Sequence, residues 1–227
     1  SIIYMYTEAF GRASYLVSRS RGKKSTVSKA LFIPLSVLEM EVEHLNKRDL
    51  HRIKETRICF PLNDVCCDPV KNVLALFLSE VLFRVVKDTE PDPRLFDYLY
   101  ESIHLLEYAD KGIANFHMVF LLGLLHHLGI FPNMESHRVG YYFDMLNGVF
   151  TDHIPMHRHY LNKVESAFFS RLLRISQMCI RDSCCVSVLR ICRFMVFPGK
   201  SGPVLFIVFL SITVYISRIF RKSNRYR

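Results

Sequence analysis

Residues 11–35 read GRASYLVSRSRGKKSTVSKALFIPL, and this stretch decides how the N-terminal part of the chain folds. The apolar run at residues 15–17 precedes a basic, glycine-containing segment, and the apolar run at residues 31–33 follows it. The pattern predicts a strand, a long loop and a second strand. No acidic residue occurs between Glu8 and Glu39. Six cations lie on the stretch: Arg12, Arg19, Arg21, Lys23, Lys24 and Lys29.

These cations are spaced as a polyanion would require. Binding a nucleic-acid backbone takes positive charges at several points along a path, with small polar side chains donating hydrogen bonds between them. The small polar residues of the loop are Ser18, Ser20, Ser25, Thr26 and Ser28. A solvated surface loop would have a similar composition, so the pattern alone leaves DNA binding and a simple surface loop both open.

Charge is distributed unevenly along the 227 residues. The formal net charge is +9, but residues 178–227 contain nine Lys/Arg and one Asp. Residues 1–57 contain eleven basic and six acidic residues, whereas residues 58–177 contain ten basic and fourteen acidic ones. The basic character of the body therefore belongs to its N-terminal segment. The acidic remainder is better suited to protein partners than to DNA.

Residues 1–58 predict a small all-β module. The chain begins in a strand pattern at residues 2–6, turns at residues 7–11, and alternates apolar and acidic residues at 38–43. Residues 46–49 predict a turn, and the next strand starts at Leu50. A strand meander with a long basic loop fits an OB-type barrel. Because the first residues already look like a strand, we expect an opening strand upstream of Ser1.

The expected pairing of the strand at residues 38–43 with the strand that starts at Leu50 makes a prediction about two further cations. If the two strands are antiparallel across the turn at residues 46–49, Glu43 lies opposite Arg52 and Glu41 lies opposite Lys54. Opposite charges across a ladder support each other. We therefore interpret Arg52 and Lys54 as structural partners rather than DNA contacts.

Residues 59–177 predict an α-helical domain. Asp68-Pro69 and Asp92-Pro93 each combine an N-cap with a proline at the first helical position. The expected buried faces are Val70, Val73, Leu74, Phe77, Leu78, Val81, Leu82 and Val85 in the first helix, and Leu95, Phe96, Leu99, Ile103 and Leu106 in the second. Residues 114–128 are apolar nearly all round and predict a central buried helix. Asn162 with Glu165 resembles the capping box of a last helix.

Residues 178–227 differ from the body in cysteine content, basicity and hydropathy. Residues 178–183, MCIRDS, can be back-translated into a sequence that resembles the transposase adapter end used in sequencing libraries. We therefore interpret 178–227 as a non-homologous tail, adapter-derived or frame-shifted. The alternative is a small tail-anchored membrane protein that uses the apolar segment 204–217, which cations follow. That segment is at the short limit for a bilayer span, so a membrane partner is the less favoured interpretation.

Several stretches of the chain, taken in order, carry a resemblance to a known family. In the N-terminal part they are residues 6–8, 10–12, 14–17, 29–35 and 53–55. In the helical part they are residues 68–71, 112–117 and 146–150. Together they resemble the RecO family of bacterial DNA-repair proteins, in the form typical of Bacteroidetes-like sequences. The resemblance extends from Ser1 to about Ile175. No single motif is specific, and the order and spacing carry the identification.

The resemblance implies an α+β multidomain protein, with an N-terminal OB-fold whose first strand is missing here, followed by an α-helical bundle. It implies a recombination mediator of the RecF pathway that binds single- and double-stranded DNA and anneals complementary strands. Its expected partners are DNA, RecR and the C-terminal tail of single-stranded-DNA-binding protein, and RecA indirectly, through help with RecA loading. The expected location is the bacterial cytoplasm, in association with the nucleoid; cysteine usage without a CxxC pair also fits a reduced compartment.

The sequence predicts neither an enzyme nor a bound cofactor. Its acids are scattered or lie on one strand, and residues 22–25, GKKS, lack the upstream glycine spacing of a phosphate-binding loop. Some members of the family carry a cysteine zinc site in the helical domain, but residues 141–150 here contain no cysteine. The nearest alternative cluster is Asp152, His153, His157 and His159, whose spacing fits no familiar site. We therefore predict no structural zinc.

Overall fold

The computed structural model describes residues 2–17, 28–43, 48–87 and 89–181. The chain forms two compact units: unit 1 is Ser1–Tyr108 and unit 2 is Ala109–Arg227. The predicted change from strands to helices coincides with the end of β4 at Ile58. Unit 1 contains, in addition to its strands, the first three helices.

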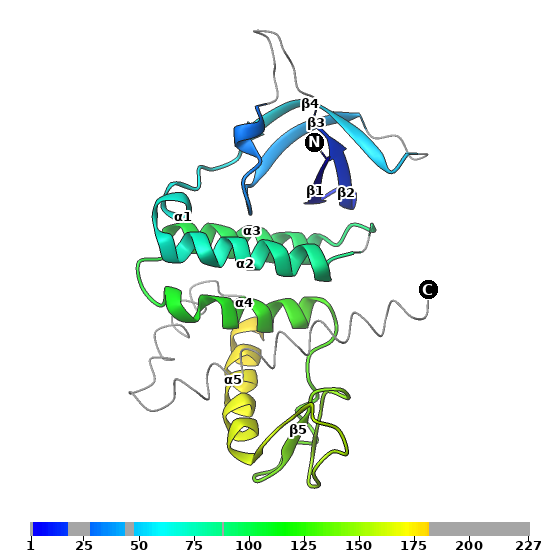
Figure 1. The fold of residues 1–227 in the computed structure, drawn as a ribbon, viewed down its shortest axis with the longest axis vertical. Coiled ribbons are helices and arrows are strands. Elements are labelled where there is room, and N and C mark those ends of the chain that lie inside the picture. Colours follow the sequence, from blue (N-terminus) through cyan, green and yellow to red (C-terminus); the bar gives the residue numbers. More distant parts are fainter. Residues whose placement is uncertain (1, 18–27, 44–47, 88, 182–227) are drawn as a thin grey trace. The chain divides into compact units, whose positions relative to one another are not determined.

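The sheet of unit 1 has four strands in the order β1-β2-β4-β3 (Figure 1). They are β1 (Ile2–Thr7), β2 (Gly11–Leu16), β3 (Leu38–Glu43) and β4 (Leu50–Ile58). β1 pairs antiparallel with β2, β2 parallel with β4, and β3 antiparallel with β4, so β1 and β3 are the edges. This N-terminal sheet followed by helices confirms the predicted α+β class, with an OB-type sheet in front of a helical region.

The register between β3 and β4 was predicted in part. Glu43 lies opposite Arg52, as expected. A bulge after Glu41 then shifts the pairing, so that Glu41 lies opposite Glu55 rather than Lys54. The Lys54 ammonium nevertheless lies 3.5 Å from the Glu41 carboxylate. The predicted ion pair therefore forms across the bulge.

The predicted strand at residues 31–33 is wrong. Lys29–Leu31 forms a short 3-10 helix, η1, in which the Leu31 amide donates to the Ser28 carbonyl at 3.3 Å. A turn follows, closed by the Ser36 amide and the Ile33 carbonyl at 3.1 Å. Pro34 inside this turn has no N–H to give to a ladder, and Leu35 has a φ of 62°. Extended pairing resumes only at β3.

The three helices of unit 1 are α1 (Asn63–Cys67), α2 (Pro69–Val85) and α3 (Pro93–Tyr108). Both predicted caps are confirmed. The Asp68 carboxylate accepts from the amides of Val70 and Lys71 at 2.7 and 3.1 Å. The Asp92 carboxylate accepts from the amides of Arg94 and Leu95 at 3.0 and 3.2 Å. Each cap satisfies amides that the first helical turn leaves unpaired.

A buried polar network ties the three helices together. The Glu107 carboxylate accepts from the Asp64 and Val65 amides at the start of α1, at 2.9 and 3.0 Å. The Lys71 ammonium donates to the Glu107 carbonyl at 2.6 Å and lies 3.4 Å from the Asp64 carboxylate. Lys71 and Glu107 are 3% and 4% exposed. Because each charged group has partners, their burial is tolerated.

The turn between β1 and β2 contacts the connection between α2 and α3. Gly11 has a φ of 59°, and a Cβ at this position would lie 2.5 Å from the Glu90 carbonyl oxygen. Only glycine combines this backbone conformation with so close an approach. The Tyr6 hydroxyl also donates to the Asp92 carbonyl at 3.4 Å. Gly11 thus allows this connection to pack against the turn of the β1–β2 hairpin.

The part of unit 2 that the structure describes, up to residue 181, contains two helices and a small sheet (Figure 1). The predicted central helix is α4 (Ile113–His127), which buries ten of its residues, and α5 is Lys163–Arg181. The predicted capping box is confirmed, because the Asn162 amide donates to the Glu165 carboxylate at 2.9 Å and the Asn162 side chain accepts from the Glu165 amide at 3.0 Å. The sheet, order β6-β5-β7, was not predicted: β5 (Tyr142–Asp144), β6 (Val149–Thr151) and β7 (Tyr160–Leu161) are short.

Within the described part of the chain, no helix has the length and apolar character needed to cross a membrane. The apolar segment 204–217, on which the tail-anchored alternative depends, lies outside the described residues, as does the rest of the tail from residue 182.

Candidate nucleic-acid interface

The structure describes some of the six predicted phosphate-binding residues and not others. Arg19, Arg21, Lys23 and Lys24 lie outside the described residues. Lys29 opens η1, and its backbone is described but its side chain is not. The residues that flank the basic segment are placed in unit 1, with Val17 1% exposed. Arg12 is the one member of the set whose side chain is described.

Arg12 is fixed against the C-terminal end of α2. One guanidinium nitrogen donates to the carbonyls of Phe83 and Val86, each at 2.9 Å. Carbonyls at the end of a helix lack partners within the helix and carry partial negative charge, so an arginine suits them. The guanidinium carbon also lies 4.7 Å from the centre of the Phe83 ring and 5.4 Å from that of Tyr4. Arg12 therefore has a structural role that the sequence did not reveal.

Two further cations of the sheet, Lys54 and Arg57, are held by acids. Lys54 pairs with Glu41, and Arg57 pairs with Glu55 at 2.8 Å. The Glu55 carboxylate raises the pKa of Arg57 by a hydrogen bond and by its charge. All four side chains are about half exposed or more, so the pairs contribute little to stability. They do show that neighbouring carboxylates largely neutralise the positive charge of Lys54 and Arg57 on β4.

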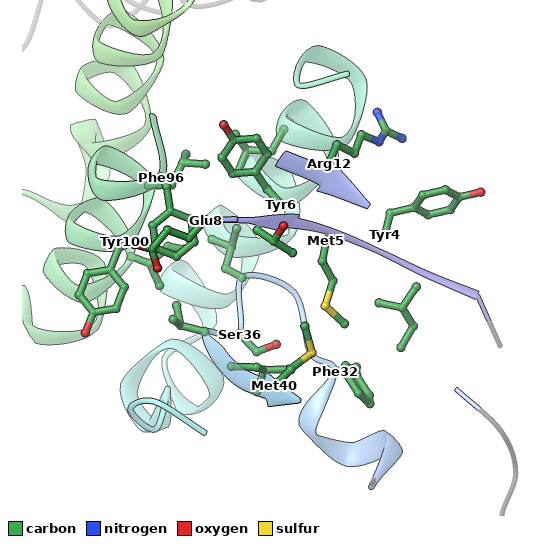
Figure 2. Close-up of a pocket in the computed structure, with 18 of the residues that line it drawn as sticks. Tyr4, Met5, Tyr6, Glu8, Arg12, Phe32, Ser36, Met40, Phe96 and Tyr100 are labelled. Atoms are coloured by element: carbon green, nitrogen blue, oxygen red, sulfur yellow. The ribbon is translucent and has the colours of Figure 1, made fainter. Parts of the chain in front are cut away.

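A cavity of about 760 Å³ lies between the sheet and the helices of unit 1 (Figure 2). Its walls come from β1, β3, the segment 32–37, α2 and α3. Met5 and Met40 face each other across it, and Phe96 and Tyr100 come from α3 (Figure 2). Tyr15, 0% exposed, belongs to the same core, and its burial raises the pKa of its phenol. Tyr15 is therefore a core residue.

In unit 2, Asp144 organises the turn between β5 and β6. Its carboxylate accepts from the amides of Leu146 and Asn147 at 2.8 and 3.2 Å and from the Asn147 side chain at 2.7 Å. The His157 ring lies 3.1 Å from the same carboxylate. Burial acts to raise the pKa of Asp144, but these hydrogen bonds and His157 outweigh it and lower the pKa. Asp144 is thus an ionised centre of its turn.

Comparison with known proteins identifies the family. Over 176 residues, covering 78% of this chain and 73% of the relative, the chain is 38% identical to a DNA repair protein RecO of Azobacteroides pseudotrichonymphae. It is 41% identical over 177 residues, with the same coverage, to a DNA repair protein RecO of Bacteroides fragilis.

The chain belongs to the RecO family.

Two further comparisons agree with RecO membership. Residues 67–142 match the family model described as "Recombination protein O C terminal". A DNA repair protein RecO of Flavobacterium psychrophilum is 33% identical over 174 residues, which cover 76% of this chain and 71% of the relative. The resemblance predicted from the sequence is confirmed, including its Bacteroidetes character, and the family supports a role in DNA repair.

The residues of this RecO chain do not fit the zinc site of some family members. Residues 141–150 contain no cysteine. Asp144 already accepts three hydrogen bonds and contacts His157. His153 is paired with Asp152 at 2.9 Å. Among the residues that the structure describes, no three His, Cys, Asp or Glu side chains converge as a metal site would require.

Sequence analysis of this RecO chain missed two aromatic residues beside Arg12. Tyr4 and Phe83 are 52% and 44% exposed. Tyr4 and Met5 are successive residues of β1, so their side chains point to opposite faces of the sheet. The period of two along this strand could therefore have predicted that Tyr4 points outward. Phe83 lies off the expected apolar face of its helix. Their meeting depends on the packing of α2 against the β1–β2 hairpin, which no local pattern encodes.

Proposed function

We propose that this chain is a non-catalytic recombination mediator of the RecF pathway that binds single- and double-stranded DNA and anneals complementary strands. The observation that carries the proposal is the basic segment, with five cations from Arg19 to Lys29, in a chain of the RecO family. Annealing two polyanions requires their mutual repulsion to be neutralised, and a run of lysines and arginines supplies this without any catalytic group.

The phosphate-binding residues in this proposal are Arg12, Arg19, Arg21, Lys23, Lys24 and Lys29. Arg19 to Lys29 would contact phosphates directly. Arg12 already donates to two carbonyls, so its contribution would come from its charge and from holding the surface next to the basic segment. Such contacts do not read the base sequence, so the chain would bind DNA of any sequence.

RecR, the C-terminal tail of single-stranded-DNA-binding protein and, indirectly, RecA are the proposed protein partners, in the cytoplasm at the nucleoid. The balance of charge supports a division of labour. Residues 58–177 carry fourteen acidic against ten basic residues, so they suit proteins better than DNA.

A strand-annealing assay tests the proposal. Two complementary labelled oligonucleotides are mixed with the full chain, and annealing and equilibrium binding are followed by fluorescence. The double variant Lys23→Ala/Lys24→Ala should bind single strands and duplex alike about 10- to 30-fold more weakly at 0.1 M salt, because two phosphate contacts are lost. Its annealing rate should fall in parallel.

The matched control is Lys87→Ala/Lys111→Ala, which removes the same charge from two exposed lysines elsewhere. It should leave annealing and binding nearly unchanged. An equal loss in both variants would assign the effect to overall charge rather than to the basic segment. Absence of annealing by the unaltered chain would refute the proposed function.

A further inference from the structure

The outward face of β1, β2 and β4 carries exposed apolar side chains next to cations. Strand register shows which residues share this face, because directly opposed residues project to the same side. Tyr4 is opposite Ser14, and Ser14 is opposite Leu50. In the same way Ile2 is opposite Leu16, which is opposite Arg52. The other face of β2 holds Ala13 and Tyr15, which are buried in the core.

We name this surface the outer strip. Its residues are Ile2, Tyr4, Arg12, Leu50 and Arg52 from the sheet and Phe83 from α2. Ile2 and Tyr4 are more than half exposed, and Leu50 is 37% exposed. Figure 2 shows Tyr4 and Arg12 on the side of β1 opposite to Met5. Together with Phe83 they also contribute to the lining of the cavity, so the outer strip adjoins it.

The two aromatic rings of the outer strip are held in place. The centres of the Tyr4 and Phe83 rings lie 5.2 Å apart in an edge-to-face arrangement, with an interplanar angle of 62°. The Arg12 guanidinium contacts both rings and is itself fixed by two carbonyls. Rings that are ordered before a ligand arrives lose little conformational freedom on binding it, which favours affinity.

We propose that Tyr4 and Phe83 stack on unpaired bases of single-stranded DNA, with Arg12 as their positioning residue. This inference rests on the proposed function and adds a base contact to its phosphate contacts. Exposed aromatic side chains beside cations are the combination by which proteins bind single strands without reading their sequence. Bases in a duplex are stacked on one another, so this contact would favour single strands over duplex.

Charge complementarity favours a nucleic acid over an apolar protein segment as the occupant. Arg12 and Arg52 flank the exposed rings and aliphatic side chains. The basic segment follows Val17, directly after the Leu16–Ile2 end of the outer strip.

The absence of tryptophan from the whole chain allows a direct test. In Tyr4→Trp the single indole would report on stacking. Addition of oligo(dT) to the full chain should quench its emission, while a duplex of the same length at equal saturation should leave most of the emission. A Phe83→Trp chain should behave in the same way. Saturating binding of oligo(dT) without quenching in both variants would overturn the inference.

Affinity provides the second test. Tyr4→Leu/Phe83→Leu keeps the strip apolar but removes both rings, and it should weaken oligo(dT) binding about 5- to 30-fold, from the usual contribution of base stacking. Duplex binding and the salt dependence should stay unchanged, because no phosphate contact is lost. The matched control is Tyr108→Leu, which removes a 59% exposed ring from the other end of the helical pair.

These outcomes separate the inference from the proposed function. If Tyr4→Leu/Phe83→Leu binds oligo(dT) normally while Lys23→Ala/Lys24→Ala does not, the chain binds DNA and the outer strip does not take part. If the unaltered chain binds no DNA, the proposed function itself fails. If the Tyr4→Leu/Phe83→Leu variant and the Tyr108→Leu control weaken binding equally, the loss does not come from stacking at the outer strip.

Discussion

His117 lies within α4, where burial lowers its pKa to about 4. An unfolded chain holds its histidines near their ordinary pKa of about 6.5. As the pH falls below about 6.5, the unfolded state therefore takes up a proton before the folded state does. Stability should be lost progressively from about pH 6.5 to about pH 4, by about 3 kcal/mol in total from this residue.

Denaturant unfolding at pH 7 and pH 5 measures this effect. Replacing the ring in His117→Leu should remove about 2 kcal/mol of the pH dependence between these two values. The exposed His126, on the last turn of the same helix, provides the control His126→Gln, which should retain the full dependence. An unchanged pH profile in His117→Leu would show that this histidine does not titrate differently in the two states.

Two neighbouring residues of α2 show where reasoning from sequence fails at the residue scale. Val73 was placed on the buried face, yet it is 64% exposed, whereas the charged Lys71 is 3% exposed. A hydrophobic pattern sorts residues by side-chain type. It cannot show that the ammonium of Lys71 finds the Glu107 carbonyl at 2.6 Å, on a different helix. That partner removes most of the cost of burying the charge.

Arg12 gives the same lesson for the candidate site. Its position in a run of cations predicted a phosphate contact. The residues that engage it, Phe83 and Val86, lie more than seventy positions away in sequence. The site prediction rested on composition and could not foresee the aromatic pair, because that pair is created by tertiary packing.

At the scale of elements, helices and strands with a strong period or a clear cap were predicted correctly, whereas short elements were not. β3 repeats its apolar–acidic alternation over six residues, and the N-caps Asp68 and Asp92 mark their helices by side-chain chemistry alone. The strands β5 to β7 have only two or three residues each, less than the length over which a period of two can be recognised. Residues 31–33 are apolar but precede Pro34, and the turn there prevents a strand.

One prediction concerns the turn at Asp144 in the small sheet of unit 2. Hydrogen bonds of the Asp144 side chain, rather than a metal ion, hold the β5–β6 turn. Dialysis of the full chain against EDTA should therefore leave its melting temperature unchanged within about 1 °C and release no zinc. By contrast, Asp144→Ala leaves the Leu146 and Asn147 amides without their acceptor. The expected loss is about 1–3 kcal/mol, or about 5 °C in melting temperature.

Asp152→Ala is the matched control in the same region. Asp152 is 74% exposed, and its pairing with His153 lies in solvent. Its removal should change the melting temperature by less than the Asp144→Ala substitution does, because exposed pairs contribute little. A chain that loses several degrees in EDTA, or that contains stoichiometric zinc, would contradict the assignment of the turn to Asp144.

At the scale of the whole molecule, the order of parts was predictable and their grouping was not. A β-rich N-terminal part followed by helices follows from the change of period near Ile58. That α2 and α3 belong to the same unit as the sheet depends on contacts such as the approach of Glu90 to Gly11. A glycine in a turn signals a special backbone conformation, but the sequence does not say which distant segment requires it.

The uneven placement of charge leads to a prediction for the whole chain on DNA. If the six cations from Arg12 to Lys29 each neutralise one phosphate, log affinity for a single strand should fall against log salt concentration with a slope of about −4. If the nine cations of residues 178–227 also took part, the slope would approach about −10. Fluorescence anisotropy with labelled oligo(dT), titrated over 50 to 300 mM salt, separates these cases. Lys23→Ala/Lys24→Ala should flatten the slope by about 1.4. A slope that is already near zero, or that does not respond to this substitution, would remove the basic segment from the DNA-binding surface even though the family role in DNA repair would stand.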